Sequence, residues 1–328
     1  MGSRVDRVTG ALLGVHAGDS LGATLEFSSW ASIQKSHPTG LRDIVGGGPF
    51  GWTAGHATDD TDCTRAVLLA YRDRNRASSP SDVDVVRLAG LHLLSWYSGR
   101  DWPDREPGSR PVDVGGATAV GLSRFALSGD PDMAGAGPGK AGNGSLMRCM
   151  PTALFQEDEE LRISEAMRIS AITHDDERCT IACAAYVTIV YALITGVEPS
   201  QAVQRGIDVA KTLEFGKEGL VQESIILGRT LKVNDLAENG PKPALPNSAS
   251  GYVLESLTIA ISALFDTRSL VDVLSDIVRI GKDTDTNAAI AGGLLGARDG
   301  AAAIPTAWID KLQFGQEFIS IALELTAS

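Results

Sequence analysis

Two short acidic segments of the chain have the residue types and spacing of a metal site. The first reads Thr58-Asp59-Asp60-Thr61-Asp62, and the second reads Gly281-Lys282-Asp283-Thr284-Asp285-Thr286-Asn287. Carboxylates this close in sequence repel one another unless a cation lies between them. Carboxylate and hydroxyl oxygens suit Mg²⁺ or Mn²⁺, and neither segment contains the His or Cys that zinc prefers. If the two segments face each other, they could hold two ions that orient substrate oxygens and activate a water.

Each segment also has a simpler interpretation as the start of a helix, because an apolar run follows both. Thr58 would be an N-cap, and Asp59 and Asp60 would favour the positive end of the helix dipole. Capping explains one carboxylate but not three within four residues. The second segment resembles the start of an EF-hand loop, but Ala288 stands where that loop needs Gly and Leu294 where it needs Glu. We therefore do not expect a calcium loop.

Helical periodicity predicts the elements that must bring these segments together. Apolar residues recur at helical spacing, and alternating strand patterns are nearly absent, so we expect an all-α fold. The expected helices cover residues 66–71, 85–97, 145–150, 163–172, 180–194, 202–213, 254–264 and 270–280. Three stretches rich in Pro, Gly and polar residues are expected to be loops: 99–113, 128–143 and 234–250. None resembles a linker, so residues 1–328 are expected to form one domain, a compact helical bundle with active-site loops between its helices.

Composition and charge narrow the class of protein. The 328 residues carry a net charge of −12, which disfavours binding to nucleic-acid backbones, and an anionic substrate would need a local cation. The apolar segment 180–195 is short for a membrane span, and the first residues do not resemble a signal peptide. The cysteines form no C-x-x-C pair and are expected to be reduced thiols of a cytoplasmic protein with no membrane contact: Cys63, Cys149, Cys179 and Cys183.

An ordered series of short motifs runs through residues 8–310. The series is Gly10-Ala-Leu-Leu-Gly14, Gly18-Asp19, Gly22 and Glu26, then Thr58-Asp59-Asp60-Thr61, Asp113-Val-Gly115, Gly142-Asn143-Gly144-Ser145-Leu-Met-Arg148, Thr173-His174, Gly281-Lys-Asp283-Thr-Asp285-Thr286-Asn287 and Ile304-Pro305-Thr306. Each motif is modest alone, but the set in this order resembles the ADP-ribosylglycohydrolase family, which includes the dinitrogenase-reductase-activating glycohydrolases. The resemblance implies a compact orthogonal helical bundle, a binuclear magnesium site (Mn²⁺ being an alternative), and hydrolysis of the bond between C1″ of ADP-ribose and an acceptor.

The resemblance also implies roles for individual residues. By motif match, the metal ligands would be Thr58, Asp59, Asp60, Asp283, Asp285 and Thr286. Either Asp60 or Asp285 would act as the base, and Glu26 would position water or protonate. The segment lining the ADP-ribose site would be Gly142, Asn143 and Gly144, with glycine N–H groups near the diphosphate and Asn143 on a ribose hydroxyl. His174 matches a position near the ligand, although a core or capping histidine is an equally good interpretation.

Asp113 and Gly115 are also expected to bind the substrate, and Asp113 indicates which acceptor is attached to the ADP-ribose. Asp113 resembles the aspartate that meets the acceptor in arginine-directed members, and a carboxylate suits a guanidinium fork. The simpler alternative is that Asp113 caps the following helix. We therefore expect the partner to be an ADP-ribosylated protein, with arginine as the linkage, or a small ADP-ribose conjugate. Serine-linked or O-acetyl ADP-ribose remains an alternative substrate, and a non-catalytic ADP-ribose binder is the alternative from another class.

Three further motifs have little support from their surroundings. The segment Gly18-Asp19-Ser20-Leu21-Gly22 fits G-x-S-x-G, but a nucleophile elbow needs a preceding strand and a downstream histidine, and here the flanks look helical and no His follows His174. The glycine-rich segment 46–51 lacks a βαβ context, so we expect a loop. Lys140 follows Gly139 without the Ser or Thr of a P-loop.

Overall fold

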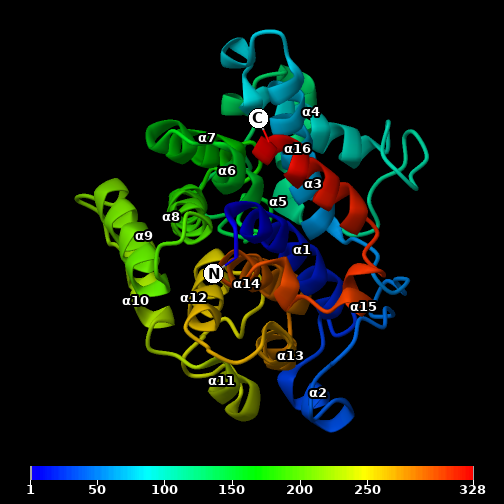
Figure 1. The fold of residues 1–328 in the computed structure, drawn as a ribbon, viewed down its shortest axis with the longest axis vertical. Coiled ribbons are helices and arrows are strands. Elements are labelled where there is room, and N and C mark those ends of the chain that lie inside the picture. Colours follow the sequence, from blue (N-terminus) through cyan, green and yellow to red (C-terminus); the bar gives the residue numbers. More distant parts are fainter. Residues whose placement is uncertain (1, 328) are drawn as a thin grey trace.

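The computed structural model describes residues 2–327, and α-helix is the dominant regular structure in that range (Figure 1), as the periodicity predicts. Within that range the chain forms no strand longer than an isolated bridge; the two bridges pair Gly47 with Trp52 and Gly142 with Tyr252. The helices are α1 (Arg4–Gly22), α2 (Trp30–Ser36), α3 (Asp59–Arg76), α4 (Val85–Ser98), α5 (Gly116–Ser128), α6 (Met150–Phe155), α7 (Glu159–Ala171), α8 (Glu177–Ile194), α9 (Pro199–Leu213), α10 (Leu220–Gly228), α11 (Val233–Asn239), α12 (Val253–Leu264), α13 (Leu270–Ile280), α14 (Thr284–Asp299), α15 (Thr306–Ile309) and α16 (Gly315–Ala327).

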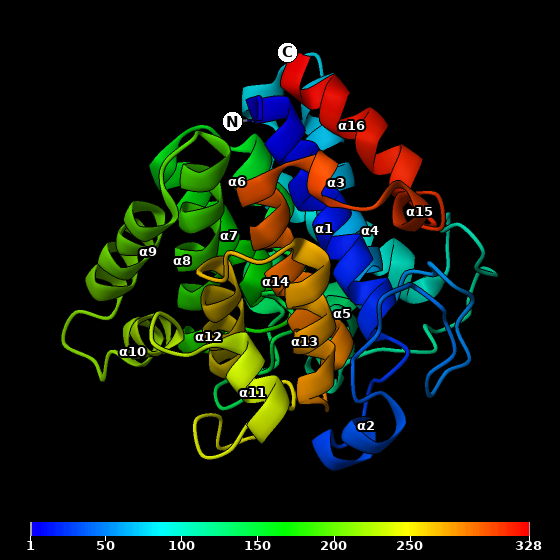
Figure 2. The same cartoon turned by 60° about the horizontal axis from the view of Figure 1, so that its bottom comes forward.

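Helices α1 and α14 lie side by side and antiparallel at the centre of the fold (Figures 1 and 2). Their contact is made by backbone, because a glycine occupies every fourth position of α1 along the shared face. A Cβ atom added to Gly14 would lie within 3.0 Å of the Gly292 carbonyl, and one added to Gly18 within 3.0 Å of the Ala288 carbonyl. Real Cβ atoms do not approach so closely, so only glycine fits. We call this contact the glycine seam; its glycines are Gly10, Gly14, Gly18, Gly22, Gly292 and Gly296.

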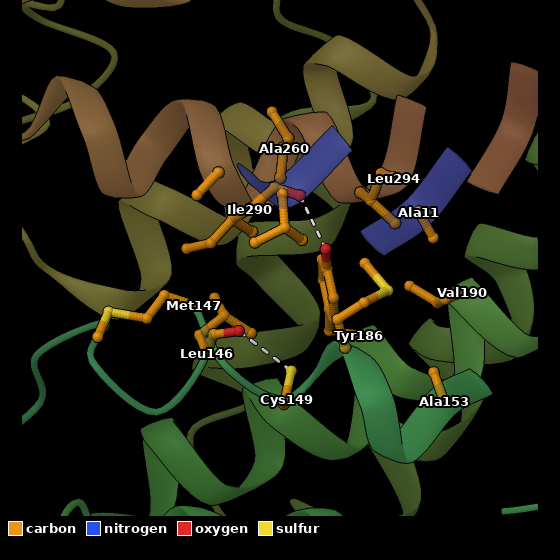
Figure 3. Packing of buried hydrophobic residues seen from close by; sticks show 14 of the residues in the cluster. Ala11, Leu146, Met147, Cys149, Ala153, Tyr186, Val190, Ala260, Ile290 and Leu294 are labelled. Atoms are coloured by element: carbon orange, nitrogen blue, oxygen red, sulfur yellow. Dashed lines mark hydrogen bonds between the residues drawn. The ribbon is translucent and has the colours of Figure 1, made fainter. Parts of the chain in front are cut away.

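The core extends from the seam to α8, which confirms the helix expected at residues 180–194 and is largely buried. Tyr186 of α8 is buried and donates its hydroxyl to the Ile290 carbonyl of α14 at 2.8 Å (Figure 3). Helix α8 is long and apolar enough to cross a membrane, but 83% of that stretch is buried inside the structure, which is typical of a core helix. The four cysteines are free and buried, and Cys149 packs in this core with its Sγ on the Leu146 carbonyl.

Two expectations about local structure are wrong. The segment 234–250 is expected to be a loop, but α11 occupies its start, because Val233, Leu236 and Ala237 share one helical face and are buried. Residues 145–150 are expected to be helical, but 145–148 form turns, Cys149 is the N-cap of α6, and the helix begins only at Met150. Pro151 lies in the first turn of α6, where its missing N–H is tolerated, whereas in a helix that began at residue 145 it would lie in the interior and clash with the carbonyl four residues before it.

Candidate metal centre and substrate pocket

The two acidic segments meet at the N-termini of α3 and α14. Thr286 donates its hydroxyl to Oδ2 of Asp60 at 3.2 Å, although the two residues are 226 positions apart. Carboxylate oxygens of Asp19, Asp60 and Asp285 lie within 4.8 Å of one another. A second such group joins Asp285 to Glu26 and Asp113, so the sequence prediction that the segments face each other is confirmed.

The helix starts explain how the sequence aims these carboxylates. Thr58 is the N-cap of α3, as expected, and its side chain accepts from the Asp60 N–H at 3.3 Å. Asp283 is the N-cap of α14 but makes no side-chain cap hydrogen bond. Its carboxylate is instead available at the cavity. The capping interpretation is therefore correct for Thr58 and leaves most of the acidic side chains without a capping role.

The donor set fits a divalent cation. Four carboxylate oxygens at the site are buried and have no hydrogen-bond partner: Asp60 Oδ1, Asp285 Oδ1, Glu26 Oε2 and Asp113 Oδ2. A buried acceptor without a partner is costly, and several adjacent ones are more so because their charges repel. A hard cation would satisfy such oxygens together, and both acidic groups consist of carboxylates alone, as Mg²⁺ or Mn²⁺ prefers.

The electrostatics of the site favour protonated carboxyls when no cation is present. Burial, followed by the charges of Asp113, Asp283 and Asp19, raises the pKa of Glu26 to about 8. Burial and the charges of Asp19 and Asp283 raise the pKa of Asp113 to about 6. Burial also holds the pKa of Asp60 and of Asp285 well above the usual range, with neighbouring aspartates adding to the effect. At neutral pH, therefore, either bound protons or a cation must offset the negative charge of these carboxylates.

A cavity of about 430 Å³ opens onto this cluster, a volume in the range of small-molecule sites. It is lined by every residue that the sequence analysis assigns to substrate binding, by Glu26, and by members of both acidic segments. These residues are Asp113, Gly115, Gly142, Asn143, Gly144, His174, Glu26, Asp59, Asp283, Asp285 and Thr286. Phe27 and Lys282 also line it; the Phe27 N–H donates to the Lys282 carbonyl, and the Lys282 N–H donates to the Ser28 carbonyl, both at 2.7 Å.

Asp113 does not cap the next helix, so that alternative is wrong. The N-cap of α5 is Gly115, and no side chain makes a cap hydrogen bond there. Asp113 is half-buried on the cavity wall, and its Oδ2 is without a partner. An unpaired carboxylate oxygen facing a cavity is suited to a cationic ligand group such as a guanidinium.

Asn143 has a structural contact that sequence reasoning does not anticipate. Its Nδ2 donates to Asp283 Oδ2 at 2.6 Å and to Ser256 Oγ at 2.9 Å. The side-chain N–H₂ group therefore orients one of the expected metal ligands. Only its carbonyl oxygen is left for a ribose hydroxyl, the contact that the family resemblance implies.

His174 is both a buried histidine and a wall of the cavity, so its two interpretations are compatible. Its Nδ1 lies 2.8 Å from the Thr173 hydroxyl, and burial together with Arg148 lowers the pKa of His174 to about 3. The ring is therefore neutral at physiological pH. A Cβ at Gly144 would lie 2.9 Å from its Cε1, so the imidazole packs where a larger residue would not fit.

Asp19 is a site residue that the sequence analysis quotes in a motif without assigning it a role. It is buried on α1 and hydrogen-bonded to Thr58 and Thr61 at the start of α3. Its signal in the sequence is a lone acidic residue within a small and apolar helical segment. Ser20 beside it lies inside α1, buried, and donates to the His56 carbonyl at 3.1 Å, so it is not on a nucleophile elbow.

The chain resembles known proteins along its whole length. The family model for ADP-ribosylglycohydrolase matches residues 2–328. The ADP-ribosylarginine hydrolase Tri1 of Pseudomonas putida is 28% identical over 323 residues, covering 98% of this chain and 78% of that protein. The ADP-ribosyl-[dinitrogen reductase] glycohydrolase of Rhodospirillum rubrum is 29% identical over 314 residues, covering 95% and 92%. A solved ADP-ribosylglycohydrolase-related protein complex matches with a TM-score of 0.76 and 26% identity, covering 100% of this chain and 99% of that chain.

Proposed function

The chain belongs to the ADP-ribosylglycohydrolase family, and on that premise we propose that it hydrolyses the C1″ bond between ADP-ribose and arginine on protein, with two Mg²⁺ ions. The observation that carries the arginine assignment is the Asp113 carboxylate. It has a buried unpaired oxygen, it lies on the cavity wall, and one of its oxygens is within 4.8 Å of carboxylate oxygens of Glu26 and Asp285. A positively charged guanidinium would relieve this concentration of negative charge, whereas a serine hydroxyl or an acetyl ester would not.

The proposed metal ligands are Thr58, Asp59, Asp60, Asp283, Asp285 and Thr286. When bound, the ions would supply Lewis-acid stabilisation of substrate oxygens and lower the pKa of a water molecule. The protein's own carboxyls complete the chemistry. Glycosidic cleavage develops positive charge at C1″, which nearby carboxylates such as Asp60 and Asp285 stabilise. Glu26, with an unpaired Oε2 and a place on the cavity wall, can hold a water against that carbon or give a proton to the departing acceptor group.

A panel of arginine-, serine- and acetyl-linked ADP-ribose tests the linkage. We expect release of ADP-ribose from the arginine conjugate only, and we expect Asp113→Asn to lower kcat/KM for that substrate by about 10²-fold, because truncating one partner of a buried charged hydrogen bond costs about 2–5 kcal/mol. The measurement is free ADP-ribose released per unit time at matched enzyme concentration.

The control for this test is Asp130→Asn, which alters an exposed carboxylate of the 128–143 loop that caps a short turn by accepting from the Asp132 N–H. We expect it to behave as the unmodified enzyme. Cleavage of the serine or acetyl conjugate at the rate of the arginine conjugate would contradict the arginine proposal. Tight ADP-ribose binding without cleavage of any conjugate would favour a non-catalytic binder.

Removal of metal should make stability depend on pH in a specific direction. Glu26 and Asp113 have pKa values of about 8 and about 6 in the folded protein, above their ordinary values of 4.5 and 3.8. Such groups stabilise the fold fully below the ordinary value, and this contribution is lost as the pH rises through the folded value. Chelated protein should therefore have a higher Tm at pH 5 than at pH 8.5.

Mg²⁺ should oppose this trend, because its positive charge stabilises the ionised form of the carboxyls around it. At about 100 times Kd it stabilises by about 2.7 kcal/mol, which raises the Tm at pH 8.5 by roughly 5 °C for a chain of this size. At pH 5 the increase should be much smaller, since the raised pKa values of Asp60 and Asp285 favour their protonated form, which binds a cation weakly. Differential scanning fluorimetry with and without EDTA measures both effects. A chelated protein whose Tm is higher at pH 8.5 than at pH 5 would argue against the cluster as the metal site.

A further inference from the structure

Asp19 is a fully buried carboxylate of α1 that lies against the start of α3. Its Oδ2 accepts from the Thr58 N–H at 3.1 Å, from the Thr61 N–H at 3.2 Å and from the Thr61 hydroxyl. Its Oδ1 accepts from the Thr58 hydroxyl at 2.8 Å. A side chain of one helix thus binds the free N–H groups at the start of another, which is the part that an N-cap residue normally plays within its own helix.

These four bonds distinguish Asp19 from the carboxylates around it. Asp60 and Asp285 each have a buried oxygen with no partner, Oδ1 in both cases, and Asp19 has none. The lone pairs of Asp19 are directed at Thr58 and Thr61 instead. Although its oxygens lie within 4.8 Å of those of Asp60 and Asp285, its hydrogen bonds are those of a support and not of a free ligand.

The same stretch of α1 also holds the start of α14. The Gly22 carbonyl accepts from the Thr284 hydroxyl at 2.7 Å. A Cβ at Gly22 would lie 2.5 Å from the backbone nitrogen of Asp285, so α1 and the second acidic segment are in direct backbone contact there. Asp19 and Gly22 are three residues apart in one helix, and they contact the N-termini of α3 and α14 respectively.

We propose that Asp19 is a positioning residue that fixes the start of α3, and with it Thr58 and Asp60, at the distance from Asp285 that a divalent cation requires. The C-terminal part of α1 is then a common support for both acidic segments. This inference rests on the proposed metal site, and its readout is cation affinity and not turnover.

In the test, each protein is first freed of metal with a chelator and then titrated with Mg²⁺. The quantity measured is the midpoint, the Mg²⁺ concentration that gives half of the maximal increase in Tm. Asp19→Asn keeps the size of the side chain but replaces one of its two acceptor oxygens with an N–H₂ group, which cannot accept from Thr58 or Thr61. We expect this variant to raise the midpoint by at least about tenfold, as for other groups that orient metal ligands. Thr61→Val removes one donor to Asp19 and should raise the midpoint by a few-fold. Thr61→Ser keeps the hydroxyl and should restore the original value.

The matched control is Asp84→Asn, since Asp84 accepts from the Val86 and Arg87 N–H groups at the start of α4. It should lower the Tm with the Mg²⁺ midpoint unchanged.

An unchanged midpoint in Asp19→Asn would overturn the proposal. A raised midpoint in Asp19→Asn, with the midpoint of Thr61→Val at the original value, would identify Asp19 as a direct ligand instead. If Asp19→Asn does not fold, the Thr61 pair decides alone. Failure of the unmodified protein to respond to Mg²⁺ or Mn²⁺ would instead reject the proposed metal site itself.

Discussion

We expect Asp60→Asn and Asp285→Asn each to abolish hydrolysis, with kcat lowered by about 10³-fold or more, while the helical circular dichroism is retained. The two side chains come from helices whose starts meet at the cavity, and each has a buried oxygen without a partner. Asparagine keeps the shape but removes the charge that would hold a cation or stabilise positive charge at C1″. The measurement is ADP-ribose release from an arginine conjugate at saturating Mg²⁺.

Stability should move in the opposite direction to activity in these variants. Each substitution removes one of several buried like charges, so the chelated variants should be at least as stable at pH 8.5 as the chelated parent. Asp73→Asn on α3, whose partner is His92 at the surface end of the helix, is the control and should retain full activity. Replacing Asp59 and Asp60 together with alanine should likewise abolish hydrolysis; full activity in that double variant refutes the metal assignment.

We expect Gly14→Ala and Gly18→Ala each to destabilise the protein by about 2–3 kcal/mol, the usual effect of overpacking. The direction is informative, because Gly→Ala inside a helix normally stabilises by about 1 kcal/mol through helix propensity. Here the new Cβ would lie within 3.0 Å of a carbonyl of α14, and backbone has no rotamer with which to move aside. Thermal unfolding should show a Tm lowered by roughly 5 °C. Gly18→Ala should in addition weaken Mg²⁺ binding, since the neighbouring Asp19 contacts the metal-site segment.

Gly116→Ala is the control for the glycine seam. Gly116 is the first residue of α5, and a Cβ there would meet nothing within 4 Å, so its Tm should be unchanged or slightly raised. If Gly14→Ala proves as stable as Gly116→Ala, the close approach of α1 and α14 is not present in solution.

The periodic parts of the fold and the chemistry of the site are predictable from the sequence. Helices such as α4, α12 and α13 carry an apolar face long enough to be recognised, and their expected bounds differ from the observed ones by at most one residue. The acidic segments are recognisable because carboxylates seldom cluster at a helix start without a reason. That the two segments face each other is a hypothesis of the sequence analysis, and the hydrogen bond from Thr286 to Asp60 confirms it.

Other features depend on partners that only the folded chain supplies. The turns at 145–148 are stabilised by Arg148, whose guanidinium donates to the carbonyls of Gly144 and Ile169 and to the Thr173 hydroxyl. Local periodicity cannot show that an arginine will be pulled inward in this way. Asp19 likewise looks like an ordinary polar residue of α1 until α3 is packed against it. Sequence reasoning fails where the hydrogen-bond partners of a side chain lie in an element that is distant in the sequence.

The glycine seam also affects how the enzyme is made. Its two helices, residues 4–22 and 284–299, are separated by more than 260 residues, so translation delivers the first long before the second. While the second helix is still inside the ribosome, Asp285 is not available to the rest of the nascent chain. The acidic start of α3 must then remain hydrated or be bound by a chaperone. Fragments and prematurely terminated products should therefore be inert, and catalytic competence should arise in one step after synthesis of the last quarter of the polypeptide.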